Sequence, residues 1–334
     1  GEEYRAHIPL LTALHATIDR VLHPLLAGAD RVALLGFPTH ANVGDSALWL
    51  GTLAYLRRHE KTVCYVAAPE TYARERLAAR LGAGGTGRIL LIGGGNFGDT
   101  WHGPQALRER VVQDFPDTPI IQLPQSVHFA HPEALARARA ILDAHPNLTL
   151  LLRDRRSLAV AREHFRAPSV LCPDMAFCLG PLRRPVPATQ RIVWLARTDR
   201  ERAVGSLPAD VPTVDWITEP ATASIRIERW LRAQMADRPR AGRLLHGPHA
   251  RISDPVARQR LYRGCALLSA AQVVITDRLH AHILSLLLGI RHVLLDNRDG
   301  KVRQFYETWT RSSPITRWAT EATEALAIAE EWVS

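Results

Sequence analysis

The sequence predicts an α/β protein made of two domains, each a parallel β-sheet with helices on both faces. Short, almost continuously apolar segments alternate with amphipathic ones, which is the pattern of parallel strands joined by crossover helices. The alternation is interrupted once, by a Pro- and Arg-rich segment at 180–190, and then resumes. With 334 residues, the chain is also too long for one ordinary hydrophobic core.

The first half of the chain is expected to form an N-terminal domain, residues 1–180. It opens with an amphipathic helix over 3–27, because apolar residues recur there at steps of three and four. Beyond it we expect strands at 31–37, 61–67, 88–95, 118–126, 148–154 and 169–179. The intervening helices are expected at 45–59, 70–81, 104–114, 132–145 and 155–165.

The second half is expected to form a C-terminal domain, residues 190–334, after a linker at 181–189. The apolar segments predict strands at 191–197, 271–276 and 291–296, with residues 213–218 continuing the alternation. The helices are expected near 223–236, 254–269, 278–288, 302–310 and 319–333.

Composition and charge narrow the class of protein. Hydrophobic residues make up 46% of the chain and charged residues 22%, as in soluble globular proteins. The net charge is +9, yet the basic residues are almost all arginines, and they are scattered rather than clustered. Because basic and aromatic residues are not interleaved, nucleic-acid binding is not expected. The excess charge fits either an arginine-rich surface or affinity for anions such as phosphorylated substrates.

Cysteine usage and hydropathy indicate a cytoplasmic protein. Cys64, Cys172, Cys178 and Cys265 form neither a CxxC pair nor a disulfide framework, so free thiols in a reducing compartment are expected. The longest apolar stretches run to about eight residues, short of the roughly 20 that cross a bilayer. No signal-peptide pattern is present, and no group of residues has metal-ligand spacing, so no metal site is expected.

Four loops that follow predicted strands carry the informative polar residues, because open parallel sheets bind ligands beyond the carboxyl ends of their strands. The first loop spans residues 37–51 and contains Asn42, Gly44, Asp45 and Ser46. Asp45 or Ser46 could simply cap the next helix. The alternative is a backbone-lined pocket in which Asn42 reads the hydroxyls of a sugar.

The second loop, residues 91–103, has three glycines directly after a buried strand, which lets a ligand approach the backbone closely. It matches neither the GxGxxG dinucleotide pattern nor a P-loop. A turn into a helix capped near Asp99 or Thr100 would explain it structurally. A dense set of polar and stacking groups favours a binding role instead: Asn96, Asp99, Trp101 and His102.

The third loop is TDRLHAH, residues 276–282, between two apolar segments. Thr276 or Asp277 is the expected N-cap, which places Arg278 in the first helical turn. The free amides and the helix dipole already favour an anion at that position, so an arginine there is unfavourable unless an anion joins it. The loop therefore predicts a phosphate or carboxylate site.

The two histidines of this loop are not expected to share a metal. His280 and His282 lie two residues apart on a helix and so point in different directions. We expect one to be functional and the other structural. The alternative for the whole loop is an ion pair between Asp277 and an arginine, together with a hydrogen-bonded core histidine.

The fourth loop, residues 294–309, follows the last predicted strand and contains Asn297 and Lys301. Lys301 is one of only two lysines in the chain and lies near an expected helix start, where a phosphate would fit. A polar turn with an exposed lysine is the alternative.

Taken together, three motifs resemble the polysaccharide pyruvyl transferases. They are RLHAHILSLLLGIRHVLLDNRDGKVRQFYETW (278–309), GGGNFGDTW (93–101) and HANVGDSALWLG (40–51). Their order and spacing are kept, and the resemblance covers about residues 31–310. The chain departs from the family at Arg291, where proline often follows Gly-Ile.

The resemblance implies two Rossmann-like domains facing a central cleft, similar to the GT-B glycosyltransferase fold. It implies that pyruvate moves from phosphoenolpyruvate to a sugar of an exopolysaccharide or its lipid-linked precursor. The product would be a cyclic ketal, with release of phosphate. Phosphoenolpyruvate would be a co-substrate, and no cofactor is expected.

The resemblance also implies roles for individual residues. Donor binding would fall to Arg278, His280, Arg197, Lys301 and Asn297. The candidates for acid–base and phosphate chemistry are His280, Arg278, Asp277, Asp45 and Asp99. By analogy with GT-B enzymes, the acceptor sugar would meet Asn42, Gly44, Asn96, Trp101 and His102.

Two alternatives remain open from the sequence. A GT-B glycosyltransferase with a nucleotide-sugar donor would need an acidic residue that reads a ribose in the second domain, and we cannot place one. A non-catalytic anion- or glycan-binding protein would not need the charged residues of the third and fourth loops.

The helix at 3–27 is expected to pack on the first domain, although contact with an anionic inner membrane surface is its alternative. Oligomeric state is not predicted.

Overall fold

The computed structural model describes residues 5–203, 205 and 210–333 and shows an α/β protein with two parallel sheets. Every strand pair that it describes is parallel. The predicted α/β class is therefore confirmed. The assignment of residues 1–180 and 190–334 to separate domains remains a prediction.

The first sheet has the strand order β2-β1-β3-β5-β6-β7, with β4 added beside β5. Its strands are β1 (Arg31–Leu35), β2 (Thr62–Ala67), β3 (Arg88–Leu91), β4 (Gly94–Gly98), β5 (Ile120–His128), β6 (Leu148–Leu152) and β7 (Ser169–Leu171). The helices of this half are α1 (Ile8–Leu26), α2 (Val43–Arg58), α3 (Arg74–Leu81), α4 (His102–Asp114), α5 (Pro132–Asp143) and α6 (Arg155–His164). A 3-10 helix, η2 (Met175–Leu179), follows β7.

The second sheet has the order β11-β10-β9-β8. Its strands are β8 (Gln190–Leu195), β9 (Ala271–Thr276), β10 (Arg291–Leu294) and β11 (Thr316–Trp318). Its helices are α7 (Ala223–Asp237), α8 (Gly242–Ser269), α9 (Leu279–Leu288), α10 (Lys301–Phe305), which runs into a π-helical turn at Tyr306–Thr310, and α11 (Ala322–Val333).

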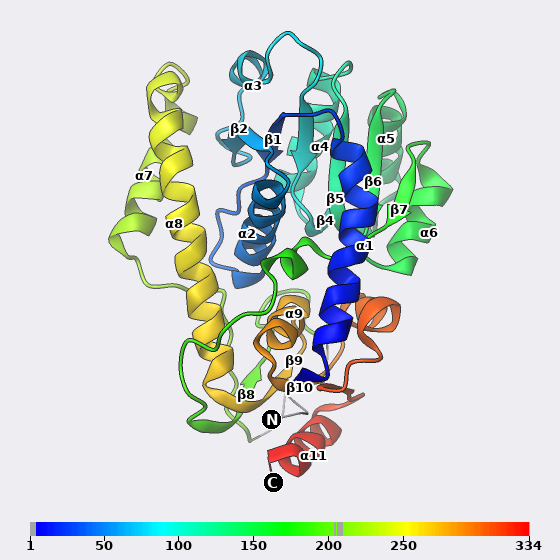
Figure 1. Ribbon diagram of the computed structural model, residues 1–334, viewed down its shortest axis with the longest axis vertical. Helices are drawn as coiled ribbons and strands as arrows, with labels where there is room; N and C mark the ends of the chain where they lie inside the picture. Colours follow the sequence, from blue (N-terminus) through cyan, green and yellow to red (C-terminus); the bar gives the residue numbers. More distant parts are fainter. Residues whose placement is uncertain (1–4, 204, 206–209, 334) are drawn as a thin grey trace.

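Figure 1 shows the first sheet above the second, with helices packed around both. Three clusters of buried residues show which faces of these elements pack together. Alternate residues of the first sheet pack against α3 to α6 on one face, and one face of the second sheet packs on α11. The other faces of both sheets belong to a single cluster that also holds residues of α1, α2, α8, α9 and η2. Residues of these helices therefore join the two sheets in one hydrophobic cluster.

The helix predicted at 3–27, whose first two residues lie outside the described range, is found at Ile8–Leu26 and packs into this cluster. Every third or fourth residue of α1 is buried, namely Leu11, Leu14, Ile18, Leu22 and Leu26. Within the described ranges, no helix combines the length and apolar character needed to span a membrane.

The largest differences from the predicted elements have local causes. Helix α8 begins at Gly242, whereas the predicted helix begins near 254. The prediction differs because α8 contains Pro248 and Pro255, and proline normally ends a helix. The predicted strand at 169–179 ends at Leu171, because Pro173 and Asp174 turn the chain into η2. The short strand β11 was not predicted.

Candidate functional site

The carboxyl ends of strands from both sheets meet at one cavity of about 340 Å³. We call it the cationic cavity, because it is lined by Arg153, Arg197, Arg278, His280 and Lys301. Arg153 follows β6 of the first sheet, whereas the other four follow β8, β9 and β10 of the second sheet. The third and fourth loops of the sequence therefore meet the first and second loops here. This is the expected place for a ligand, because open parallel sheets bind ligands beyond the carboxyl ends of their strands.

Carboxylates hold the arginines of the cavity in place. Arg278 donates from Nε and Nη2 to the two carboxylate oxygens of Asp215, at 2.6 and 2.9 Å. Arg197 makes the same two-pronged contact with Asp199, at 2.9 and 2.8 Å, and also contacts Glu201. These bidentate pairs fix the guanidinium planes.

Lys301 is almost fully buried and is held by Glu201. Its Nζ donates to Glu201 Oε1 at 2.7 Å. Burial lowers the pKa of Lys301, an effect that the charge of Glu201 opposes. The predicted anion site is thus partly neutralised by the protein's own acidic groups.

The cations nevertheless keep donors for a ligand. In the described part of the chain, Nη2 of Arg153 and Nη1 of both Arg197 and Arg278 have no hydrogen-bond partner. Lys301 uses one of its three N–H bonds. An anion in the cavity can therefore gain new hydrogen bonds without breaking the existing ion pairs.

His280 is part of a buried charge network. Its Nε2 lies 3.1 Å from Asp174 Oδ2, and the same oxygen accepts from Arg153 Nη1 at 2.8 Å. Burial alone would raise the pKa of Asp174, but His280 and Arg153 lower it to about 2. Asp174 is therefore ionised at neutral pH and can only accept, which places a proton on His280 Nε2. The other ring nitrogen, Nδ1, takes no part in this contact and lies next to Gly44.

Two glycines allow this network to pack closely. A Cβ atom on Gly44 would lie 2.6 Å from His280 Nδ1, so only glycine leaves room for the ring. A Cβ atom on Gly95 would lie 3.1 Å from both Arg153 Nη2 and Lys301 Nζ. The glycines of the first and second loops thus admit the charged groups of the site.

A second cavity of about 320 Å³ adjoins the first on the side of the first sheet. We call it the first-sheet cavity; it shares Asp45, Asn96 and Trp101 with the cationic cavity and is also lined by His102. The guanidinium of Arg200 lies over one face of the Trp101 ring, 4.4 Å from its centre. A sugar would have to stack on the other face.

Asp45 differs from the other acidic groups at the cavities. It is half-buried, lines both cavities, and has no hydrogen-bond or ion-pair partner among the described residues. Its expected role as a helix cap is wrong, as is that of Ser46. Asn42 caps α2 instead, through a 3.1 Å bond from Gly44 N–H to Asn42 Oδ1.

Four predicted site residues line neither cavity. Gly44, predicted to bind the acceptor, lies against the His280 ring instead. Asp99 accepts from the backbone N–H groups of Ala130 and His131, which holds the loop after β5. Asn297 accepts from Val302 N–H at 3.3 Å and organises the turn before α10. Asp277 accepts from Arg197 N–H at 2.9 Å, and burial raises its pKa to about 6.

The helix caps expected in the second and third loops are wrong. Trp101, rather than Asp99 or Thr100, is the N-cap residue of α4. Arg278, rather than Thr276 or Asp277, is the N-cap residue of α9. Thr276 Oγ1 accepts from Arg278 N–H at 3.0 Å, so it supports the turn before the helix.

The two histidines of the third loop differ as expected. Whereas His280 lines the cationic cavity, His282 is fully buried. Its ring nitrogens lie 2.7 Å from His292 and 2.8 Å from Thr310. Burial lowers the pKa of His282 well below the usual value, so it is a neutral core residue.

Comparison with known proteins decides the family. The profile of the family described as polysaccharide pyruvyl transferase matches residues 42–299. The chain belongs to the polysaccharide pyruvyl transferase family. It is therefore a transferase enzyme, and the resemblance seen in the sequence is confirmed.

Two curated relatives extend over most of this pyruvyl transferase. Pyruvyl transferase 1 of Schizosaccharomyces pombe is 35% identical over 92% of this chain and 77% of its own length. The putative pyruvyl transferase EpsO of Bacillus subtilis is 32% identical over 86% of this chain and 88% of its own length. A solved structure of an uncharacterised protein from Klebsiella pneumoniae has a TM-score of 0.59. It is 16% identical and covers 92% of this chain and 98% of that one, which shows a shared fold.

Several charged residues in and around the cationic cavity are not predicted from the sequence. Arg153 falls near the end of the predicted strand at 148–154, and Asp174 falls in the middle of the predicted strand at 169–179. Asp199, Glu201 and Asp215 were not singled out. The available signal was the presence of ionised residues in or next to apolar strand segments, where a charge must find a partner. Asp199 and Glu201 pair with the nearby Arg197, but the Asp215–Arg278 and Glu201–Lys301 pairs join residues far apart in the chain and are not visible in the sequence.

Proposed function

We propose that this pyruvyl transferase uses phosphoenolpyruvate as its donor and binds it in the cationic cavity. The acceptor, a sugar of an exopolysaccharide or its lipid-linked precursor, would occupy the first-sheet cavity. In this proposal the two sheets belong to two Rossmann-like domains in a GT-B-like arrangement, with the active site between them. The observation that carries the proposal is the convergence of four cations and the His280–Asp174 pair on one cavity.

The chemistry of phosphoenolpyruvate supports this assignment. The molecule carries a phosphate and a carboxylate, so it needs several donors arranged around a small volume. The unused N–H groups of Arg153, Arg197 and Arg278, with Lys301, can supply them. The acidic partners keep these side chains oriented before the donor arrives, which reduces the cost of ordering them on binding.

Ketal formation needs an acid, a base and stabilisation of a leaving phosphate. A proton adds to the methylene carbon of phosphoenolpyruvate, and a sugar hydroxyl attacks the adjacent carbon and loses its proton. The bond from that carbon to the phosphate oxygen breaks, and phosphate leaves with the electron pair. A second hydroxyl of the sugar then adds to the same carbon and releases a proton, which closes the ring.

The geometry favours particular residues for these steps. Asp45 is the free carboxylate that faces both cavities, so we assign it the exchange of protons with the sugar hydroxyl. His280, held by Asp174, is placed to protonate the departing phosphate, with Arg278 and Lys301 stabilising its charge. Asp99 and Asp277 lie outside the cavities and are less suited to direct proton transfer.

The acceptor assignment rests on the polar and aromatic lining of the first-sheet cavity. Asn96 and His102 offer hydrogen-bonding side chains there, and Trp101 offers one open ring face, whereas Asn42 lines the adjoining cationic cavity. Aromatic faces and amide groups are well matched to the apolar and hydroxyl faces of a sugar ring. The comparisons do not favour the alternative of a nucleotide-sugar glycosyltransferase.

The proposal is tested by turnover. The enzyme is incubated with phosphoenolpyruvate and a panel of oligosaccharide and lipid-linked acceptors, while phosphate release and acceptor mass are followed. The expected result is phosphate release that requires an acceptor, together with the mass gain of one pyruvate ketal. Transfer from UDP- or GDP-sugars, without reaction of phosphoenolpyruvate, would show that the proposed donor is wrong.

A further inference from the structure

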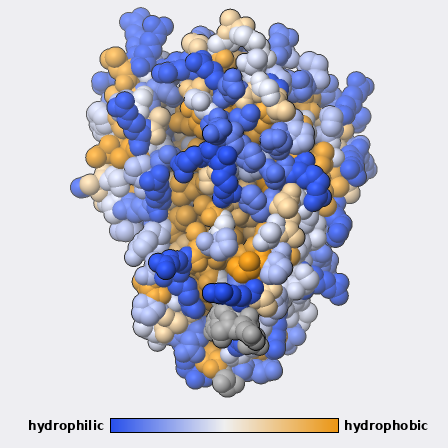
Figure 2. Space-filling model, in the orientation of Figure 1, coloured by the Kyte–Doolittle hydropathy of each residue, from blue (hydrophilic) through white to orange (hydrophobic). Residues whose placement is uncertain are grey.

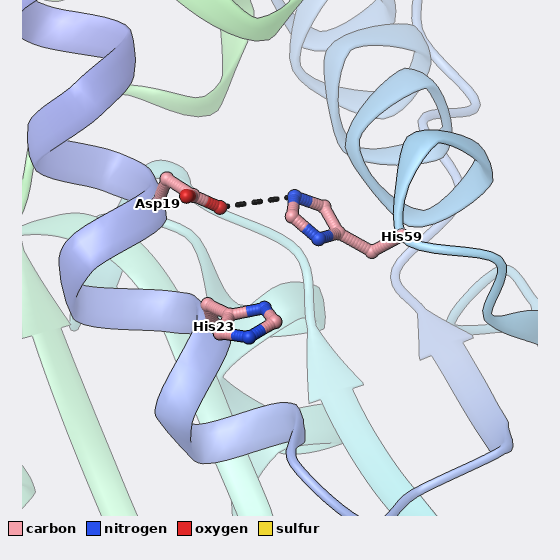
Figure 3. A group of neighbouring side chains, drawn as sticks. All are labelled: Asp19, His23 and His59. Atoms are coloured by element: carbon pink, nitrogen blue, oxygen red, sulfur yellow. Dashed lines mark ion pairs between the residues drawn. The ribbon is translucent and has the colours of Figure 1, made fainter.

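A cluster of three side chains of the types that ligate metals lies where α1 meets the end of α2. Asp19 and His23 project from α1, and His59 is the C-cap residue of α2 (Figure 3). One ligand atom from each side chain lies within 4.8 Å of the others. Asp19 and His23 are four residues apart, a spacing that places both on one face of a helix.

The distances fit a tetrahedral metal ion. His59 Nε2 lies 2.9 Å from Asp19 Oδ1, and the rings of His23 and His59 have centres 5.2 Å apart. With metal–nitrogen bonds of roughly 2.1 Å, two imidazoles on a tetrahedral ion have ring centres roughly 5.2 Å apart. The Asp19–His59 pair would need to open by only about 0.5 Å to admit the ion.

Neighbouring residues already orient two of the three ligands. The Tyr55 hydroxyl donates to Asp19 Oδ1 at 2.9 Å, and the Tyr55 ring lies 4.3 Å from that of His59. Such outer contacts are typical of metal sites, because they fix the ligand side chains before the ion binds. Arg58 points to His15 and to Cys178 O, so its charge has other partners.

We propose that Asp19, His23 and His59 bind a divalent transition-metal ion, with Zn²⁺ the best match. Two imidazoles and one carboxylate suit Zn²⁺ and leave one position for water. The ion would replace the proton now shared between His59 Nε2 and Asp19 Oδ1 and would link α1 to α2. Because the other end of α2 carries Asn42, Gly44 and Asp45, the site stabilises the helix that begins at the cavities.

The test measures metal binding directly, on protein without a histidine tag. Zn²⁺ is titrated against a chromophoric chelator, and Co²⁺ is added separately to record its visible absorption. Wild type is expected to bind one ion tightly, with the absorption of tetrahedral Co²⁺, and to unfold at a higher temperature with Zn²⁺ than with chelator.

Matched variants decide whether the ion binds at this cluster. His23→Gln and His59→Gln should each weaken Zn²⁺ binding by about tenfold or more. His131→Gln, which alters a histidine–carboxylate pair without a second imidazole, should leave it unchanged. Because His23 is exposed, its variant should fold normally. Equal binding by wild type and all three variants, or no binding by wild type, would overturn the proposal.

A second, independent feature is the surface of the helix pair α7 and α8. Residues 223–269 contain ten arginines and three acidic residues, a formal net charge of +7 in a chain of +9. Among the described residues, the large hydrophobic side chains that are exposed all lie between 214 and 262. Figure 2 shows apolar atoms among polar ones along the left edge, where Figure 1 places this helix pair.

Apolar and basic side chains are interspersed on these helices. We define the α7–α8 face by its exposed apolar residues, Ile227, Trp230, Leu244 and Tyr262, and its exposed arginines, Arg226, Arg229, Arg243, Arg251 and Arg258. Trp230 is 57% exposed and Leu244 81% exposed, which is costly in water. Basic residues mixed with Trp and Leu on a surface helix suit the boundary of an anionic bilayer.

We infer that the α7–α8 face docks on an anionic membrane surface. The apolar side chains would enter the headgroup region, and the arginines would contact lipid phosphates. The inference does not depend on the identity of the donor. The apolar face of α1 is buried, so the α7–α8 face, and not α1, would contact the membrane.

The test is flotation with vesicles of phosphatidylcholine, with and without phosphatidylglycerol. Wild type should bind only the anionic vesicles, and less at high salt. An Ile227→Ser/Trp230→Ser variant and an Arg226→Ser/Arg243→Ser/Arg251→Ser variant should both lose binding. An Arg20→Ser/Arg166→Ser/Arg311→Ser control removes the same charge elsewhere and should still bind.

Two results would overturn this inference. One is no binding of wild type to anionic vesicles. The other is that the Arg226/Arg243/Arg251 variant and the Arg20/Arg166/Arg311 control bind vesicles equally weakly while the Ile227/Trp230 variant binds like wild type. Binding would then depend on net charge alone. Affinity for phosphoenolpyruvate in solution is measured in parallel and should stay constant, which separates this test from that of the proposed donor.

Discussion

At the scale of single residues, the site is a set of buried charges that hold one another in place. Asp174 is its clearest example, because it lies between Arg153 and His280 and is fully buried. Removing one partner of a buried ion pair leaves the other charge unpaired, which costs more than the pair itself contributes.

Replacing Asp174 with Asn should therefore destabilise the protein and impair catalysis. We expect a loss of about 3–5 kcal/mol in the free energy of unfolding, because Arg153 stays charged and buried. Urea denaturation of wild type and the Asp174→Asn variant measures this loss. An unchanged unfolding midpoint would contradict the assigned network.

Gly95 provides a second test at this scale. In Gly95→Ala the added methyl group would lie 3.1 Å from Arg153 Nη2 and Lys301 Nζ, between two donors of the cationic cavity. We expect phosphoenolpyruvate to bind about tenfold more weakly, a change of about 1.4 kcal/mol. Gly247→Ala is the matched control, since a Cβ atom there meets nothing within 4 Å. Equal donor affinity in both variants would argue against this location.

Asp277 gives a pH-dependent prediction. Its pKa in the folded protein, about 6, lies above the ordinary value of 3.8. As pH rises, Asp277 therefore loses its proton at a lower pH in the unfolded chain than in the folded protein. This group therefore lowers stability as pH rises from about 4 to about 6, by at most about 3 kcal/mol. Asp277→Asn keeps an acceptor for Arg197 N–H and should be more stable than wild type above pH 6, but not at pH 4. Denaturation at both pH values measures the difference, and a difference that does not vary with pH would refute the assignment.

At the scale of elements, the strands and most helices could be predicted because their signals are local. Apolar strands followed by polar loops mark the carboxyl ends of parallel strands, and those ends brought together Asn42, Asn96, Arg278 and Lys301. The ion pairs could not be predicted in this way. Arg278 and Asp215 are 63 residues apart, and the pairing of Leu195 in β8 with both Thr276 in β9 and Val214 brings them together.

Helix α8 shows why one element boundary was misplaced. Proline disfavours a helix interior because it lacks an N–H group and clashes with the preceding turn. Here packing on α2 and α7 outweighs that cost: Trp49 Nε1 donates to Asp254 at 3.3 Å, and His249 lies 3.0 Å from Glu228. Local propensity is overridden by contacts that the sequence does not reveal.

Replacing the exposed Pro255 with Ala should stabilise α8. The variant restores the backbone hydrogen bond to Arg251 O and relieves the clash. We expect a gain of about 1–2 kcal/mol after allowing for the more flexible unfolded chain, seen as a higher unfolding temperature. A lower unfolding temperature would mean that the helix needs its proline at this position.

At the scale of the whole molecule, one hydrophobic cluster joins the two sheets, and the loops of both sheets line one cavity. The central claim is that the donor binds in the cationic cavity, mainly to residues that follow strands of the second sheet together with Arg153 from the first, and that the acceptor binds on the first sheet. It follows from where the strands end, because each sheet delivers a different set of side chains to the same space.

The most direct test is calorimetric titration of phosphoenolpyruvate into wild type and into the Arg278→Ala/His280→Ala variant, with Gly247→Ala as a folded control. We expect binding by wild type and the control and loss of binding in the double variant, because the donor's phosphate and carboxylate would lose two of their contacts in the cationic cavity. Undiminished binding by the double variant would contradict the placement of the donor.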